Sequence, residues 1–193
     1  MAKLDREIIV SEALALLDEL GLDEVSTRRL AKRLGVEQPS LYWHFPSKAV
    51  LLEAMADAAM ALHATAPLPT PSDDWREWLL ENSRSFRRAL LAHRDGARLH
   101  AGTRPRGADL SRALHKVDFL IAAGLPERDA QMAMLTTGHF TVGSVLEEQA
   151  GGAPGAEAAE HPHPDPASAF DAGLELIVDG VAQRAGRATS KRP

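Results

Sequence analysis

Among the metal-binding side-chain types in the second half of the sequence, three are candidates for one metal site: His100, His139 and Glu147. His100 stands just before a helix break at Gly102 and Pro105, so its imidazole can lie at a helix end. His139 and Glu147 are two turns apart on one predicted helix and share a face. Neutral imidazole is a common ligand of divalent metals, and carboxylates suit Mg²⁺.

The neighbouring side chains suit a flat ligand that is rich in oxygen. Asn82 and Phe86 are one turn apart, which sets an amide beside an aromatic ring on one helix face. Thr103 and Arg104 add a hydroxyl and a guanidinium next to His100. Together these groups can hold a flat ligand that is chelated to Mg²⁺.

Each of these residues also has a purely structural interpretation. A lone buried histidine such as His139 is often a hydrogen-bonded core residue. Phe86 fits an ordinary core position, Glu147 a solvated helix end, and Arg104 a turn before proline.

Residues 26–48, STRRLAKRLGVEQPSLYWHFPSK, indicate a different chemistry. Ser26 is placed to cap a first helix, and Gly35 supplies the positive φ that ends it. Pro39 suits the first turn of a second helix, from about Gln38 to His44, with polar and aromatic side chains. This layout is typical of a helix-turn-helix, whose second helix enters the major groove of DNA; an ordinary αα-hairpin is the alternative.

The composition allows DNA binding only through a local patch. The 193 residues carry 22 basic and 27 acidic side chains, for a net charge of −5, so the chain is not a bulk polyanion binder. Residues 26–33 hold four basic groups and no acidic one. The absence of cysteine excludes disulfides and thiolate metal sites. No segment is apolar enough for a membrane span or a signal peptide, so we expect a cytoplasmic protein.

The hydrophobic spacing predicts an all-α protein. An N-terminal three-helix helix-turn-helix head precedes a larger helical ligand-binding and dimerisation domain. The expected organisation is a DNA-binding domain over 1–47, a linking helix over 48–66, the larger domain over 67–185 and a disordered tail over 186–193. Helices are predicted at about 5–20, 48–64, 73–92, 95–101, 108–123, 127–149 and 167–185, besides the two of the reader, with a loop at 150–166. The last two helices predict a four-helix bundle between two copies of the chain.

The reader segment, and QPSLYWHFPSK above all, resembles the DNA-binding domain of the tetracycline repressor (TetR) family. The resemblance continues through NSRSFRRALLAHRDGARLHAGTRP (82–105) and GHFTVGSVLEEQ (138–149), and it resumes in FDAGLELIVDG (170–180). It implies a homodimeric repressor that binds a palindromic double-stranded operator and is released by a small-molecule effector with Mg²⁺. The DNA-contacting residues that it implies are Thr27, Arg28, Gln38, Pro39, Ser40, Tyr42, Trp43, His44 and Lys48.

For the effector, the resemblance implies a drug-binding set in which His100 holds the Mg²⁺ of a tetracycline-like chelate. Glu147 reaches the water shell of that metal from the other subunit, and Asn82 and Phe86 contact the drug. His139 lines the cavity near the metal. The turn Thr103-Arg104-Pro105 refolds on binding, and Lys116 occupies a further contact position.

Three positions depart from the family pattern. Ala64 replaces a histidine that grips the polar end of tetracycline, and the retained neighbour His63 points about 100° away from that position. Lys116 replaces a glutamine, and Ser40 replaces a threonine. The effector is therefore a tetracycline-like Mg²⁺ chelate or a different, non-chelating polyketide or drug-like ligand.

Two rival functions make different demands on the sequence. A metal-dependent helical hydrolase would use His100, His139 and Glu147, but the chain has no second acidic set and no nucleophile motif such as GxSxG. A helical dimer that binds only ligand or protein would show no salt-dependent affinity for DNA, whereas a repressor loses affinity steeply as salt rises.

Overall fold

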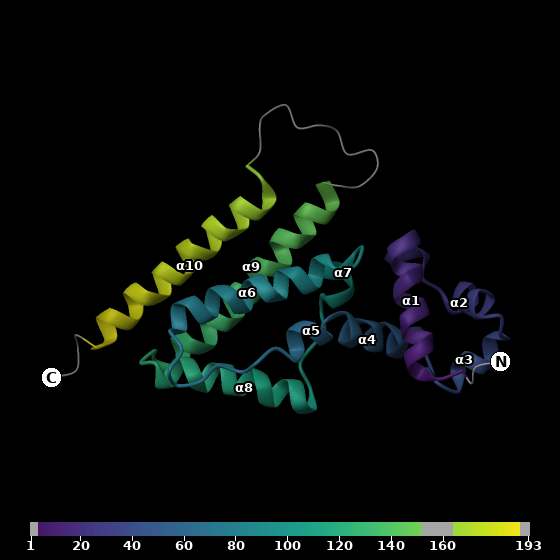
Figure 1. The fold of residues 1–193 in the computed structure, drawn as a ribbon, viewed down its shortest axis with the longest axis horizontal. Coiled ribbons are helices and arrows are strands. Elements are labelled where there is room, and N and C mark those ends of the chain that lie inside the picture. Colours follow the sequence, from purple (N-terminus) through teal and green to yellow (C-terminus); the bar gives the residue numbers. More distant parts are fainter. Residues whose placement is uncertain (1–3, 152–163, 190–193) are drawn as a thin grey trace. The chain divides into compact units, whose positions relative to one another are not determined.

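The computed structural model describes residues 4–151 and 164–189, and in these ranges it is all-helical, which confirms the predicted fold class (Figure 1). The elements are α1 (Arg6–Leu20), η1 (Leu22–Glu24), α2 (Thr27–Leu34), α3 (Gln38–Tyr42), α4 (Lys48–Ala59), α5 (Ala61–Ala64), α6 (Trp75–Leu91), α7 (Gly96–His100), α8 (Gly107–Ala122), α9 (Glu127–Gly151) and α10 (Pro166–Thr189).

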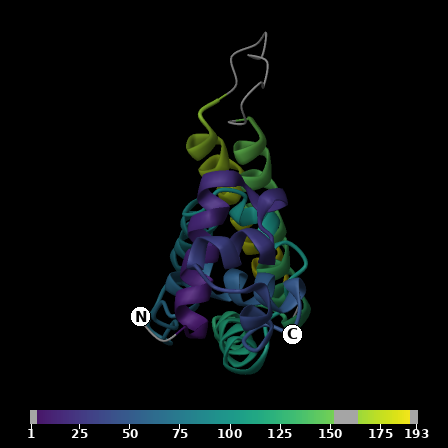
Figure 2. The ribbon, with the colours of Figure 1, turned by 90° about the vertical axis from the view of Figure 1, so that its right-hand side faces the viewer.

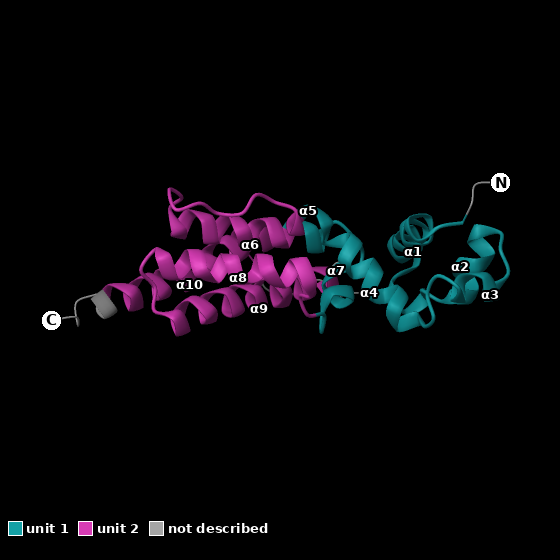
Figure 3. Cartoon of the chain, turned by 90° about the horizontal axis from the view of Figure 1, so that it is seen from below, with its two compact units in different colours: residues 1–62, 88–103 teal, residues 63–87, 104–193 magenta. Residues whose placement is uncertain are grey.

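The chain forms two compact units, each made of two separate segments (Figure 3). Unit 1 comprises residues 1–62 and 88–103, and unit 2 comprises residues 63–87 and 104–193. The short helix α7 therefore belongs to the same unit as the N-terminal helices, although most of α6 precedes it in sequence and belongs to unit 2.

Side-chain caps fix the starts of three helices in unit 1. The Asp5 carboxylate accepts a hydrogen bond from the Ile8 N–H at the start of α1. Ser26 and Ser47 cap α2 and α4 in the same way. Each cap satisfies a backbone donor that lacks a partner inside the helix. The helix starts therefore follow from local sequence.

The helix that we expected over 48–64 is divided at Met60. This residue lies outside the helical run, with φ −88° and ψ −3°, and its N–H bonds to the Ala56 carbonyl. The next residues form the separate short helix α5. Neither glycine nor proline marks the division, so the local sequence carried no signal for it.

In unit 1, α1 packs against α2 and α4, and α2 packs against α3. Ile9, Leu17, Leu30, Leu41 and Met55 are almost fully buried in these helices. Full burial of such a side chain contributes about 1.5–3 kcal/mol. These contacts join the reader helices to α1 and α4.

Unit 2 has a separate apolar core formed by α6, α8, α9, α10 and the α8–α9 turn. Leu79, Phe119, Leu120 and Val178 are buried together there, and Trp78 meets Phe119 edge to face at 5.2 Å between centroids. Within this unit α10 lies along α9 as an extensive helical pair (Figures 1 and 2). Its last turn reaches Thr189, beyond the position where we expected the tail to begin.

The expected loop over 150–166 falls largely outside the described residues. Among the described helices, none combines the length and apolar character needed to cross a membrane.

Candidate functional site

Residues 26–42 form a helix-turn-helix. The Gly35 backbone adopts φ +66°, which a glycine reaches without a Cβ penalty, and its N–H bonds to carbonyls at the end of α2. Pro39 lies in the first turn of α3. The reader helix ends at Tyr42, two residues before the predicted end.

A hydrogen-bond network organises the exposed face of this motif. The Gln38 side-chain amide donates to the Thr27 hydroxyl at 2.9 Å and to the Tyr42 hydroxyl at 3.2 Å. The network joins the start of α2 to both ends of α3. It fixes the orientation of Gln38, whose amide is suited to reading adenine.

The predicted DNA-contacting residues gather on α2, α3 and the start of α4. Trp43 is 90% exposed, and Tyr42 is 44% exposed. Arg28, Pro39 and Lys48 are also exposed, whereas Ser40 and His44 are half-buried. A large aromatic ring that remains open to solvent next to the reader helix is available for a partner surface.

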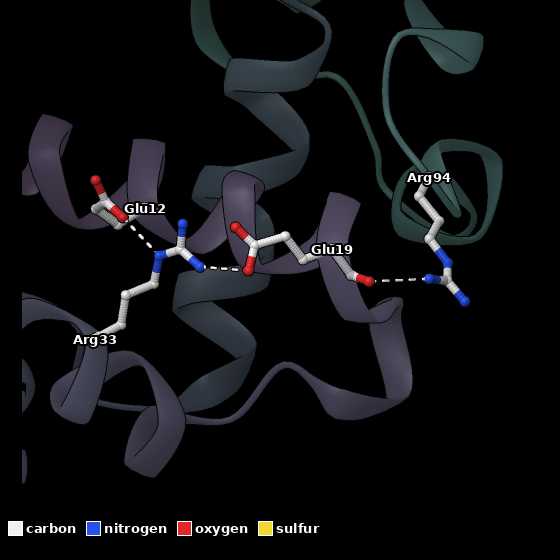
Figure 4. Close-up of polar contacts among 4 residues, drawn as sticks. All are labelled: Glu12, Glu19, Arg33 and Arg94. Atoms are coloured by element: carbon white, nitrogen blue, oxygen red, sulfur yellow. Dashed lines mark hydrogen bonds and ion pairs between the residues drawn. The ribbon is translucent and has the colours of Figure 1, made fainter.

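Half of the basic patch is neutralised inside unit 1. Arg33 forms ion pairs of 2.7 Å with both Glu12 and Glu19 of α1 (Figure 4), and these carboxylates raise the pKa of its guanidinium. Arg29 pairs with Glu24 at 2.5 Å. Arg33 therefore ties α2 to α1, and it adds little net charge to the DNA-facing surface.

The other two cations of the patch remain available to an anionic partner. Within the described parts of the chain, Arg28 and Lys32 lie in no ion pair with a carboxylate. They supply the free positive charge that phosphates attract.

The turn between α6 and α7 is bonded to the end of α1, within unit 1. The Asp18 carboxylate accepts from the Arg94 backbone N–H at 3.0 Å and lies 3.0 Å from Nδ1 of His93. The Arg94 guanidinium donates to the Glu19 carbonyl at 3.2 Å (Figure 4).

A second set of bonds joins α7 to η1. Arg98 contacts both carboxylate oxygens of Asp23, and the Asp95 carboxylate accepts from the Leu22 N–H at 2.8 Å. Gly96 permits the tight turn, because an added Cβ would lie 2.1 Å from the Leu90 carbonyl oxygen. Helix α7, which ends in His100, is therefore joined by hydrogen bonds to η1, the element that precedes the reader helices in unit 1.

His100 is the last residue of α7 and is half-buried. Its Nδ1 lies 3.4 Å from the Thr103 hydroxyl, and the Thr103 N–H bonds to its carbonyl. Burial lowers the pKa of the imidazole below its usual range. A neutral ring at neutral pH is the form that binds metals.

Most of the other predicted effector residues belong to unit 2, and the structure brings three of them into two contacts. The Lys116 ammonium donates to the Asn82 carbonyl oxygen at 2.8 Å, which joins α8 to α6. One turn further along α6, the ring of Phe86 lies 5.3 Å from the imidazole of His63 between centroids.

The remaining four predicted residues are exposed: Arg104, Pro105, His139 and Glu147. In the single chain, His139 therefore does not belong to the core of unit 2. Among the described residues, no three or more His, Asp or Glu side chains gather closely enough to hold a metal by themselves.

Sequence reasoning set aside one residue that the structure brings to this set. We expected His63 to point about 100° away from position 64. Both residues lie in α5, so the division at Met60 does not change that relation, but His63 still contacts α6. Its Nδ1 lies 3.1 Å from the Ser85 hydroxyl, beside Phe86. No sequence pattern indicated a role for Arg112 and His115 of α8, which contact the backbone carbonyls of Ala66 and Pro69.

The fold and the exposed reader define the class: this is a helix-turn-helix regulator. Two family profiles match the chain, "Bacterial regulatory proteins, tetR family" over residues 9–55 and "Tetracyclin repressor-like, C-terminal domain" over residues 67–169. The chain belongs to the TetR family and, like its relatives, is a transcriptional regulator rather than an enzyme.

Relatives match nearly the whole chain. It is 46% identical to the tetracycline repressor protein class A from transposon 1721 of Escherichia coli, over 95% of this chain and 93% of that protein. A solved structure of class A TetR with 5a,6-anhydrotetracycline and magnesium is 48% identical, with a TM-score of 0.81 over 94% of this chain and 99% of that chain. A TetR-family regulator from Streptomyces coelicolor is 62% identical, with a TM-score of 0.74 over 94% and 97% of the two chains.

Proposed function

We propose that this protein is a homodimeric repressor that binds a palindromic operator and is released by a tetracycline-like Mg²⁺ chelate. The observation that carries this proposal is the position of His100. It ends α7, which packs on α4 and is hydrogen-bonded to η1 in the unit that contains the DNA reader. An effector that binds His100 therefore acts on the support of the reader.

For operator binding, α3 enters the major groove. Arg28 and Gln38 have the chemistry to read guanine and adenine edges. Thr27, Tyr42, His44 and Lys48 contact phosphates and set the register, and Pro39, Ser40 and Trp43 complete the surface. Two readers on a two-fold axis require half-sites about 34–36 Å apart, or a multiple of this spacing.

The dimer is supported by apolar side chains that α9 and α10 leave exposed. Leu176 of α10 is 76% exposed, and Leu135 and Met132 of α9 are 48% and 44% exposed. Apolar groups on two long neighbouring helices suit a four-helix bundle with a second copy. Leu176→Glu should shift the mass in solution from dimer to monomer, as measured by light scattering.

The residues present are compatible with a metal that arrives with the effector. Mg²⁺ keeps several waters and takes few protein ligands, so it does not need the three-residue cluster that the described chain lacks. His100 would hold the ion with a neutral nitrogen, and Glu147 of the second subunit would reach its waters. Bound there, the ion would join the oxygen atoms of the effector to the protein.

In release, the effector favours a conformation in which the two readers no longer match one face of the operator. Displacement of the turn His100-Thr103-Arg104-Pro105 moves α7, and α7 carries its contacts on α4 and η1 with it. The driving free energy is the preference of the effector for the state that does not bind DNA. Coupling is reciprocal, so the operator weakens effector binding by the same factor.

The test uses an operator duplex that the full-length protein selects from random sequence. Binding is followed by fluorescence anisotropy while tetracycline is added with and without Mg²⁺. Release should require Mg²⁺ and should be lost in His100→Ala. Normal release of His100→Ala would end the metal-trigger proposal, and no salt-dependent binding to any duplex would end the repressor proposal.

A non-chelating polyketide or drug-like effector is the second candidate, because Ala64 and Lys116 alter the polar contacts to the ligand. It predicts release that is independent of Mg²⁺ and that survives EDTA. The two candidates therefore give opposite results in the metal arm of the same titration.

A further inference from the structure

Lys116 of α8 presents a charge that the surrounding protein does not neutralise. The side chain is half-buried, and its ammonium donates to the neutral Asn82 carbonyl oxygen at 2.8 Å. In the described parts of the chain no carboxylate forms an ion pair with it. An ammonium has three donors, so this contact leaves donor capacity for another acceptor.

A second cation lies one turn earlier on the same helix face. Arg112 is half-buried, and its guanidinium donates to the Ala66 carbonyl, again a neutral acceptor. The described residues include no carboxylate in an ion pair with Arg112 either. Burial lowers the pKa of Lys116 to about 8, the Arg112 charge adds to this effect, and Asp109 opposes it. The ammonium therefore stays largely protonated near neutral pH.

Lys116 and Arg112 are two half-buried cations whose hydrogen-bond partners are neutral, so neither has a counter-charge in direct contact. Removing a charge from water is costly unless a counter-charge and hydrogen bonds replace the lost hydration. A ligand with an anionic oxygen would supply both. A neutral carbonyl of a ligand would supply only the hydrogen bond.

The groups needed to orient such a ligand lie on α6 and on the short helix α5. Asn82 and Phe86 share a face of α6, one turn apart, and His63 contacts the Phe86 ring. One turn is about 5.4 Å, the scale of one or two fused rings. A flat ligand on Phe86 can therefore place a substituent at Lys116.

We infer that Lys116, assisted by Arg112, selects effectors that carry an anionic oxygen, a carboxylate or an ionised phenol or enol, and disfavours their neutral analogues. This inference rests on the proposed function, since it names the chemical class of the effector. Lysine has donors only, unlike the glutamine in the family pattern, so a ligand group that only donates finds no partner there.

The test compares two flat probes that differ only in charge, anthraquinone-2-carboxylate and anthraquinone-2-carboxamide. Affinities for the full-length protein are measured by calorimetry near neutral pH. The wild type should bind the carboxylate at least about tenfold more tightly, because a charge-assisted hydrogen bond is about twice as strong as a neutral one. Lys116→Gln should remove most of this preference, with the remainder due to Arg112, and Lys116→Arg should retain most of it.

Controls separate local recognition from overall charge and folding. Arg128→Gln removes one exposed positive charge of unit 2 and should leave the ratio of affinities unchanged. Arg112→Gln should reduce the ratio by a smaller factor than Lys116→Gln. Thermal melting of each variant establishes that it is folded before the ratios are compared.

Equal affinity of the wild type for the two probes would overturn the inference, as would a preference that is undiminished in Lys116→Gln. Failure of the wild type to bind either probe up to its solubility limit would also overturn it. The proposed function fails separately, through loss of operator binding or of effector-driven release, which the anisotropy assay measures without these probes.

Discussion

Arg98 and Asp23, 75 residues apart in sequence, form a two-point ion pair with N···O distances of 3.2 and 2.9 Å. Arg98 lies on the helix that ends in the predicted metal ligand, and Asp23 lies in η1, which precedes the reader. The pair lowers the pKa of the aspartate through the hydrogen bond and the charge of the arginine. It connects the predicted effector residue with the DNA-binding head.

Breaking this pair should weaken the response to effector. We expect Arg98→Gln and Asp23→Asn each to raise the effector concentration for half-release about two- to fivefold, since exposed pairs are weak. Operator affinity without effector should change less. The anisotropy titration measures both quantities. The double variant should match Arg98→Gln, which also loses the ion pair with Asp95, and additive effects would contradict a direct coupling between Arg98 and Asp23.

The paired and unpaired cations of the head should respond differently to salt. Lys48→Gln removes a predicted phosphate contact from each subunit of the proposed dimer, so it should reduce the slope of log affinity against log salt by about 1.8. Arg33→Gln should lower operator affinity by loosening α2 from α1, with little change in slope, because Glu12 and Glu19 already neutralise its charge. Equal loss of slope in the two variants would contradict this assignment.

The pH dependence of stability should reflect His100. Its folded-state pKa lies below the usual 6.5, so the unfolded chain takes up the proton first as the pH falls. This contribution to stability is fully present above the pKa of His100 in the unfolded chain. It is lost as the pH falls from that pKa through the lower pKa of the folded chain. The Tm of the wild type should therefore drop more between about pH 7.5 and pH 5.5 than that of His100→Gln. Parallel curves would exclude the effect.

The pairing of α9 and α10 should depend on Gly173. A Cβ at this position would lie 2.6 Å from the Phe140 ring, which stacks on Phe170 at 5.4 Å between centroids. Gly173→Ala should cost about 1–3 kcal/mol in the free energy of unfolding through overpacking. Chemical denaturation measures the loss. Adding Phe140→Leu should relieve the clash, and a double variant no better than the sum of both changes would contradict this cause.

The preference for acidic probes should fade in alkaline solution. The free-state pKa of Lys116 is about 8, so the fraction of ammonium falls as the pH passes this value. Affinity for anthraquinone-2-carboxylate should decrease by up to tenfold per pH unit above it, and affinity for the carboxamide should stay nearly constant. Calorimetry at a series of pH values tests this. A constant ratio would show that the ammonium is not the selecting group.

The sequence predicted those parts of the fold that depend on local chemistry. The caps Ser26 and Ser47, the left-handed turn at Gly35 and the apolar stripe of α1 each follow from a few neighbouring residues, and the structure contains them all. The division at Met60 was not predictable in this way, because no residue type marks it. The contacts of His63 with Ser85 and Phe86 were not predictable either, because they join residues 22 and 23 positions apart.

Contacts between side chains that are far apart in the sequence were the second feature that could not be predicted. The run of four basic residues at 26–33 indicated a uniform patch, but Arg33 meets glutamates 14 and 21 residues away along the chain. Of the predicted contact residues, Thr27, Gln38 and Tyr42 are joined by hydrogen bonds. The bond between Asn82 and Lys116 joins residues 34 positions apart, and no local pattern announces it.

The split composition of unit 1 has a practical consequence for building hybrid regulators. A graft cut after residue 66 would carry the reader away from residues 88–103, which supply the partners of Asp18, Leu22 and Asp23. The transplanted head would then meet a foreign α6–α7 turn. A chimera that takes both segments from one parent should keep effector-driven release from the operator. A chimera that exchanges only the N-terminal segment should lose it.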